Sequence, residues 1–132
     1  MPVRVFTSKL IRQALSEQEL QDLKDDFKDY KSGNWIPKTF GRDALYDHPH
    51  TYPLARQEEI QHIHLADSSY WPVCALQFRR TSDEHLVYCQ GIRDENCYLL
   101  IQVLRPDAHN KARNNNVMHM IATEAGRFRD QF

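Results

Sequence analysis

The chain has 132 residues, of which 41% are hydrophobic and 27% charged, so we expect one globular domain over residues 1–132. No apolar run is long enough to span a bilayer and the N-terminus lacks a signal-peptide pattern, so we expect a cytoplasmic protein without a membrane partner. The three cysteines form no CxxC pair, which argues against a disulfide framework or a zinc ribbon. The formal net charge of −1 hides a basic stretch over residues 105–132. Such a stretch is typical of a phosphate-binding face and equally of a solvated helix.

The N-terminal part predicts a strand followed by a helical hairpin. Residues 3–7 are β-branched and aromatic, as in a strand, and residues 8–15 place apolar side chains at helical spacing. Ser16 and Glu19 have the spacing of a capping box, which predicts the start of a second helix. Gly33 is placed to end that helix.

The middle of the chain predicts a long loop and then an antiparallel sheet. Residues 34–57 contain three prolines and a glycine and indicate mostly loop. A strand is expected within residues 59–67, and residues 75–80 indicate a short strand or the edge of a loop. Residues 85–92 and 97–104 predict a hairpin, whose second strand is apolar on both faces and so is expected to be central.

The C-terminal part predicts helices. Pro106 suits the first turn of a short helix, and the run Asn114–Asn116 can cap a final one. We expect the final helix to bury Val117, Ile121, Ala125 and Phe128. The predicted fold is therefore α+β, with an N-terminal strand, a helical hairpin, a small antiparallel sheet and a C-terminal helix.

Two histidines are the most informative polar residues, because they lie one residue apart on a predicted strand. His62 and His64 then share one face, opposite Ile63 and Leu65, and we expect the imidazoles on the open side of the sheet. Three interpretations compete: a metal site joined by Asp67, a proton-transfer site, or ordinary polar residues. The compact ligand spacing of a zinc site is missing, so we rank metal binding below proton transfer and predict no metal or other cofactor.

Several stretches, in this order along nearly the whole chain, resemble the YafO family of bacterial type II toxins. They are FTSKLIR, FGRDALYD, HIHLAD, HLVYCQG, LRP with His109, AR and MHMI. The resemblance implies a RelE-like fold and a ribosome-associated endoribonuclease that cleaves mRNA and halts translation. It also implies a cognate antitoxin of the YafN kind.

Metal-independent RNA cleavage requires a base for the ribose 2′-OH, an acid for the leaving 5′-oxygen and cations beside the phosphorane. We expect the base to be His62 or His64. The candidate acids are His85, His109 and His119. The candidate phosphate-binding residues are Arg80, Lys111 and Arg113.

Two further alternatives stay open at this point. Arg42 is expected either to form an ion pair with Asp43 or to contact phosphate. Trp35, Tyr70 and Trp71 are expected in loops, where they stack on bases or are covered by the antitoxin. The rival function is a non-enzymatic toxin of the same fold that blocks a macromolecular target such as gyrase or the ribosome.

Overall fold

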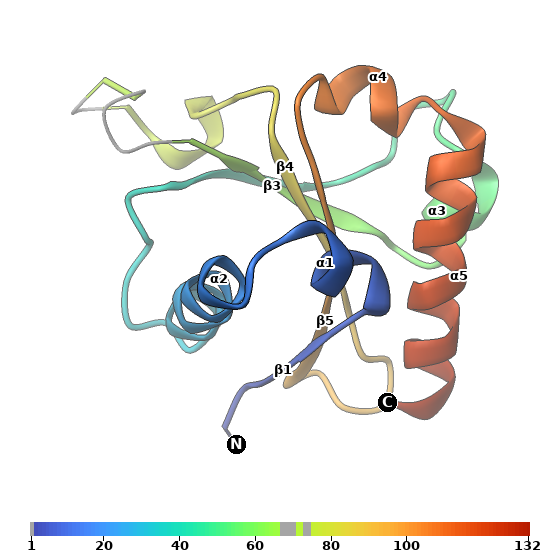
Figure 1. Cartoon of the computed structure of the whole chain (residues 1–132), viewed down its shortest axis with the longest axis horizontal. Coiled ribbons are helices and arrows are strands. Elements are labelled where there is room, and N and C mark those ends of the chain that lie inside the picture. Colours follow the sequence, from blue (N-terminus) through green and yellow to red (C-terminus); the bar gives the residue numbers. More distant parts are fainter. Residues whose placement is uncertain (1, 67–70, 73–74) are drawn as a thin grey trace.

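The computed structural model describes residues 2–66, 71–72 and 75–132, and within these residues the strands form one five-stranded sheet (Figure 1). Their order across the sheet is β1-β5-β4-β3-β2. Strand β1 is parallel to β5, and the other neighbours are antiparallel. The strands are β1 (Arg4–Thr7), β2 (Phe40–Leu45), β3 (Gln61–Leu65), β4 (His85–Gln90) and β5 (Cys97–Leu104).

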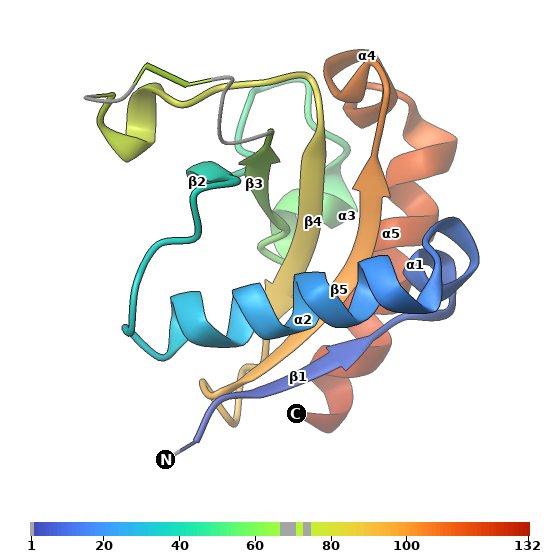
Figure 2. The ribbon, with the colours of Figure 1, turned by 60° about the vertical axis from the view of Figure 1, so that its left-hand side comes forward.

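Helices cover both faces of this sheet, and Figure 2 shows α2 in front of it and α5 behind it. The helices are α1 (Lys9–Ala14), α2 (Glu17–Lys31), α3 (Pro53–Gln57), α4 (Ala108–Ala112) and α5 (Asn115–Gln131), with a 3₁₀ turn, η1 (Gln77–Arg79). The predicted α+β class is confirmed. No helix in the described part of the chain is long and apolar enough to cross a membrane.

The core has two parts, one on each face of the sheet. On the α2 side, Phe27 packs with Ile63 and Leu100, and on the α5 side Ile101 packs with Ile121. Strand β5 contributes to both parts, which confirms that it is central and covered on both faces. Burial of apolar surface on both sides supplies most of the free energy that holds the sheet between its helices.

The alternation along β5 is interrupted by one extra residue. Val87 pairs with Gln102 and Tyr88 pairs with Leu100, so Ile101 has no partner of its own on β4. Such a bulge reverses the faces of the residues beyond it. Val103 therefore packs on the α2 side, although strict alternation along the strand would place it on the α5 side with Ile101.

The predicted helix ends agree with the structure at three positions. The Ser16 hydroxyl accepts the Glu19 N–H at 3.1 Å, while the Glu19 carboxylate accepts the Ser16 N–H at 3.4 Å. Gly33 follows α2 with φ of +80°, a conformation that glycine adopts without steric cost. The Asn114 side chain caps α5. Pro106, in contrast, lies before α4, which begins only at Ala108.

The predicted loop over residues 34–57 contains two elements, β2 and α3. Neither element was predicted, because prolines usually indicate a loop. Pro53 occupies the first turn of α3, however, where its missing N–H costs nothing. Strand β2 is an edge strand and contains Gly41, at which an added Cβ would lie 2.2 Å from the Arg80 carbonyl oxygen. Only glycine fits this approach of β2 to the segment that follows η1. Residues 77–79, within the expected short strand or loop edge, form the 3₁₀ turn η1.

Candidate active site

An open pocket of about 1040 Å³ lies where β2, β3 and β4 meet the segment around α4. Its lining contains six histidines and two arginines, the latter from β2 and from the residue after α4. Its polar lining residues include Arg42, Tyr46, His48, His50, His62, His64, Ser82, Asp83, His85, His109 and Arg113. The pocket therefore collects basic side chains from segments that are far apart in the sequence.

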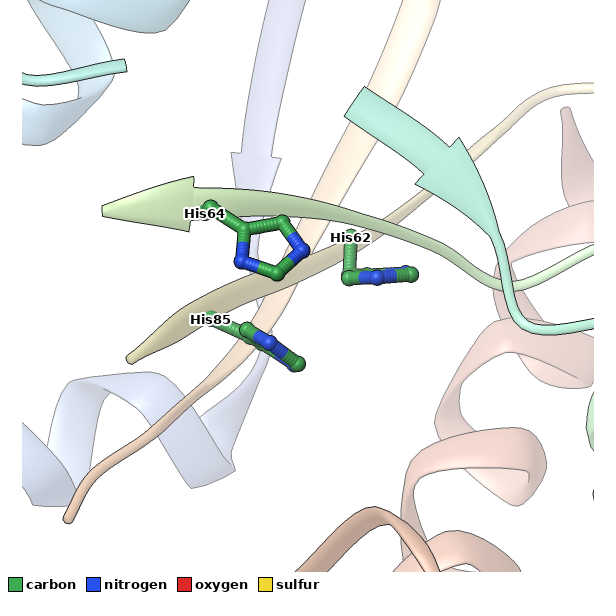
Figure 3. A group of neighbouring side chains, drawn as sticks. All are labelled: His62, His64 and His85. Atoms are coloured by element: carbon green, nitrogen blue, oxygen red, sulfur yellow. The ribbon is translucent and has the colours of Figure 1, made fainter. Parts of the chain in front are cut away.

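Three histidines form the inner wall of the pocket, and we call His62, His64 and His85 the histidine trio (Figure 3). His64 is paired with His85 across β3 and β4, and His62 is paired with Val87. The ring centroids are 5.2 Å apart for His62 and His64, 4.6 Å for His62 and His85, and 4.4 Å for His64 and His85. His62 and His64 lie on the face opposite Ile63, as predicted, and His85 joins them there, but all three side chains are buried rather than openly exposed.

Burial determines the charge state of the trio. The relative exposure is 8% for His62, 5% for His64 and 2% for His85. Loss of hydration, followed by the charges of neighbouring imidazoles, lowers the pKa of His62 and of His85 to about 3. Burial also lowers the pKa of His64. The trio is therefore a set of neutral imidazoles near pH 7.

Tyr46 is a neighbour of the trio that the sequence reasoning missed. Its ring is stacked on His62 at 3.9 Å, and its hydroxyl lies 2.7 Å from His85 Nδ1. Burial raises the pKa of Tyr46, so the phenol is neutral and can donate to or accept from the imidazole. The stretch FGRDALYD contains Tyr46, but nothing in the spacing of that stretch indicated this contact.

His64 differs from its two neighbours in its hydrogen bonds. Its Nδ1 lies 2.8 Å from the Ser82 N–H nitrogen and 2.9 Å from the Ser82 carbonyl oxygen. An unprotonated Nδ1 accepts from that N–H, and a protonated Nδ1 donates to that carbonyl. Within the described residues, His62 Nδ1 and His85 Nε2 are buried with no hydrogen-bond partner. Two nitrogens of the trio thus lack the partner that buried polar atoms normally have.

His109 comes from α4 and stands at the outer side of the trio. Its ring centroid is 5.2 Å from that of His85 and 6.2 Å from that of His64. The Asp83 carboxylate accepts from the His109 backbone N–H at 3.1 Å and lies 2.8 Å from His109 Nδ1. These hydrogen bonds lower the pKa of Asp83 and keep it ionised. Asp83 therefore fixes the orientation of the His109 ring through Nδ1. The second ring nitrogen of His109, Nε2, is not part of this contact.

Arg42 is on the pocket face of β2, and its positive charge contributes to the lowered pKa of His62 and of His64. Asp43 is on the other face, where its carboxylate accepts from the Tyr30 and Tyr88 hydroxyls at 2.8 and 2.7 Å. Lys31 forms the ion pair with Asp43 at 3.3 Å. The expected pairing of Arg42 with Asp43 is wrong, because adjacent residues of a strand point to opposite faces.

Several expected site residues lie elsewhere. His119 contacts the Tyr52 hydroxyl at 2.9 Å, Lys111 Nζ donates to the Arg105 carbonyl at 2.7 Å, and Arg80 Nε donates to the Ala75 carbonyl at 3.1 Å. These three do not line the pocket.

The aromatic residues expected in loops also differ from one another. Trp71 is 8% exposed and its indole N–H donates to the Lys38 carbonyl, so it is not an exposed base-stacking residue. Trp35 is 59% exposed. Tyr70 and Asp67 lie outside the described residues.

The described residues form an α+β domain whose pocket brings neutral imidazoles and guanidinium groups together. The family model described as "Toxin YafO, type II toxin-antitoxin system" matches residues 28–130, and the chain belongs to this family. It is similar to the mRNA interferase toxin YafO of Escherichia coli (strain K12), with 50% identity over 132 residues, 98% of this chain and 100% of that protein. No solved structure gave a significant match.

Proposed function

We propose that this toxin is an mRNA interferase that cleaves mRNA on the ribosome by acid–base chemistry without a metal, and that a YafN-like antitoxin neutralises it. One observation carries the proposal: the ring centroids of His64 and His109 are 6.2 Å apart in a pocket that also contains Arg42 and Arg113. The name of the relative from E. coli, mRNA interferase toxin, supports the substrate class.

The reaction that suits this geometry is attack of the ribose 2′-oxygen on the adjacent phosphorus. The base removes the 2′-OH proton, the new O–P bond forms, and the bond from phosphorus to the 5′-oxygen breaks. The acid then gives a proton to the leaving 5′-oxygen. The products are a 2′,3′-cyclic phosphate and a 5′-hydroxyl end. Each well-placed proton transfer contributes roughly 10²–10⁴-fold to the rate.

His64 is the base in this proposal, because its surroundings tolerate both of its protonation states. When Nε2 takes the proton from the 2′-OH, Nδ1 can remain protonated and donate to the Ser82 carbonyl, 2.9 Å away. The pKa values of His62 and His85, which burial lowers to about 3, make these two residues weak bases. We assign these two to shaping the inner wall of the pocket.

His109 is the acid, because Asp83 supports a positive charge on its ring through a contact of 2.8 Å. With Nδ1 held by Asp83, the remaining ring nitrogen, Nε2, delivers the proton. Arg42 and Arg113 bind the scissile phosphate and stabilise the charge that builds up on its oxygens.

The overall charge supports a ribosome-bound substrate. Binding to free RNA depends largely on neutralising phosphates with Lys and Arg, and this chain has a formal net charge of −1. A protein with so little net positive charge benefits from a ribosome that presents the mRNA in the correct position. Membership of a type II toxin–antitoxin family supports the antitoxin partner.

The test is to induce His64→Asn, His109→Asn and the wild type in cells and to map mRNA 5′ ends. We expect new ends and growth arrest with the wild type, and a loss of both by at least about 10²-fold in each variant. His119→Asn is the matched control, because His119 is exposed and outside the pocket. Antitoxin binding by each variant checks the fold.

Undiminished cleavage by the folded His64→Asn and His109→Asn variants would remove the mechanism. Growth arrest by the wild type without new mRNA ends would instead show a toxin that blocks its target without cutting.

A further inference from the structure

We propose that the histidine trio is a binding site for a divalent transition metal, with Zn²⁺ as the expected ion, and that the bound metal holds the toxin inactive. The binding site stands on the geometry of the trio alone. The inhibitory effect rests on the proposed function, because it assumes that His64 must move a proton.

The positions of the ring nitrogens fit a shared ion. One nitrogen from each member of the trio lies within 4.8 Å of those from the other two. Zinc–imidazole bonds are about 2.0–2.1 Å long, so each of these nitrogens needs to move by less than about 1 Å to reach one tetrahedral ion. Small rotations of the three rings, which Figure 3 shows converging from β3 and β4, provide such a shift.

The hydrogen bonds of the trio leave one nitrogen of each ring available to bind a metal ion. His62 Nδ1 and His85 Nε2 are buried and have no partner in the described structure. An unsatisfied buried polar atom costs about 1–3 kcal/mol, and coordination to a metal would remove that cost at both positions. His64 Nδ1 is held by Ser82, so Nε2 is its free ligand atom.

The opposite ring nitrogens have the outer partners that metal-binding histidines usually need. Such histidines commonly donate their second N–H to a carbonyl or a hydroxyl, which fixes the tautomer. His64 Nδ1 can donate to the Ser82 carbonyl at 2.9 Å, and His85 Nδ1 can donate to the Tyr46 hydroxyl at 2.7 Å. Two of the three ligands are therefore already oriented for coordination.

The ligand type selects the class of ion. Three neutral imidazoles favour Zn²⁺, Cu²⁺, Ni²⁺ or Co²⁺ over Mg²⁺ and Ca²⁺, which prefer oxygen ligands. The fourth position would face the pocket and take water. Coordination uses the lone pair of His64 Nε2, and a nitrogen whose lone pair binds a metal cannot accept the 2′-OH proton. Metal binding and the proposed cleavage therefore exclude each other at this atom.

The binding test uses the purified, metal-free toxin titrated with Co²⁺, whose visible spectrum reports coordination geometry, and then with Zn²⁺ by calorimetry. We expect one ion per chain and a tetrahedral Co²⁺ spectrum that Zn²⁺ abolishes. His85→Asn and His62→Asn should each weaken binding by more than the roughly 10–100-fold that loss of an outer partner causes. His119→Asn, the matched control, should bind as the wild type does. Using two trio variants keeps the test valid if one does not fold.

The pocket contains two other histidines, His48 and His50, which serve as a second control. A double His48→Asn/His50→Asn variant should keep the metal. Loss of binding in this variant or in His119→Asn, with binding intact in the trio variants, would overturn the assignment to the trio. Absence of binding at stoichiometric Zn²⁺ would also overturn it, without affecting the proposed nuclease.

The activity test compares ribosome-dependent mRNA cleavage by the metal-free and the Zn²⁺-loaded toxin. We expect cleavage by the metal-free protein, a loss of at least tenfold on loading, and recovery when a chelator removes the ion. Binding at the trio without a loss of cleavage would overturn the inhibitory role. Cleavage only in the loaded state would overturn that role and also the metal-independent mechanism, while supporting the site itself.

Discussion

The imidazoles of His62 and His85 are buried and uncharged, and acidification of the metal-free protein measures the cost of keeping them uncharged. In the unfolded chain an imidazole has a pKa near 6.5, whereas burial lowers the pKa of both residues to about 3. Between these two values only the unfolded chain takes up the protons. The free energy of unfolding is therefore unaffected well above pH 6.5 and falls progressively as the pH drops from 6.5 towards 3.

The loss of unfolding free energy at a given pH depends on how far that pH lies below the ordinary pKa of histidine. At pH 5, which is about 1.5 units below 6.5, the unprotonated His62 and His85 each cost about 2 kcal/mol, and the two together cost about 4 kcal/mol. His64, whose pKa burial also lowers, adds to this loss. This is a large share of the roughly 5–15 kcal/mol by which a domain of this size is normally stable. Asp83 and Glu19, whose pKa values are lowered from values near 4, contribute only at lower pH.

The assay is urea unfolding at pH 7 and at pH 5 with EDTA present. We expect the free energy of unfolding of the wild type to fall by at least about 4 kcal/mol, and that of His62→Asn to fall by about 2 kcal/mol less than the wild type. His119→Asn should lose as much stability as the wild type. A wild-type difference below about 1 kcal/mol would show that the two imidazoles are hydrated in solution and would refute the reasoning.

Three further substitutions test the supports of the pocket by urea or thermal unfolding. Tyr46→Phe removes the hydroxyl beside His85 Nδ1 and should cost about 1–3 kcal/mol, and an unchanged stability would mean that water replaces it. Gly41→Ala places a methyl group against the Arg80 carbonyl and should cost about 1–3 kcal/mol, whereas a neutral effect would show that β2 moves freely. Asp43→Asn weakens the charged acceptor of two tyrosine hydroxyls and should cost about 1.5–3 kcal/mol, a value that a silent substitution would contradict.

The sequence predicted those parts of the fold that local patterns determine. The capping box at Ser16, the glycine after α2 and the Asn114 cap are short-range signals, and the structure has all three. Strands β4 and β5 were predictable because long apolar runs flank a short turn. In contrast, β2 is short, lies at the edge of the sheet and contains Gly41, which is present because Arg80 comes close in space and not because of its neighbours in sequence.

In the candidate site too, some features depend on residues that are close in the sequence and others on residues that are far apart in it. The i, i+2 spacing placed His62 and His64 on one face, but the burial of His62 depends on Tyr46, which stacks on its ring from the segment after β2. The position of His109 depends on Asp83, 26 residues away in the sequence. His119 could not be separated from the other histidines by sequence alone, because its distance from the pocket is set by the packing of α5.

Strand β2 links the stability of the α2 side to the chemistry of the pocket. Arg42 faces the pocket from this strand, with Tyr46 directly after it, while Asp43 points to the other side and binds Lys31 and the tyrosine hydroxyls. An edge strand forms hydrogen bonds to only one neighbouring strand. The contacts of Asp43 therefore hold β2 in place where a second neighbouring strand is missing. Any change that loosens Asp43 should therefore also let Arg42 shift away from the histidine trio. In this way a hydrogen-bond network on the opposite face of β2 determines where the positive charge of Arg42 lies in the pocket.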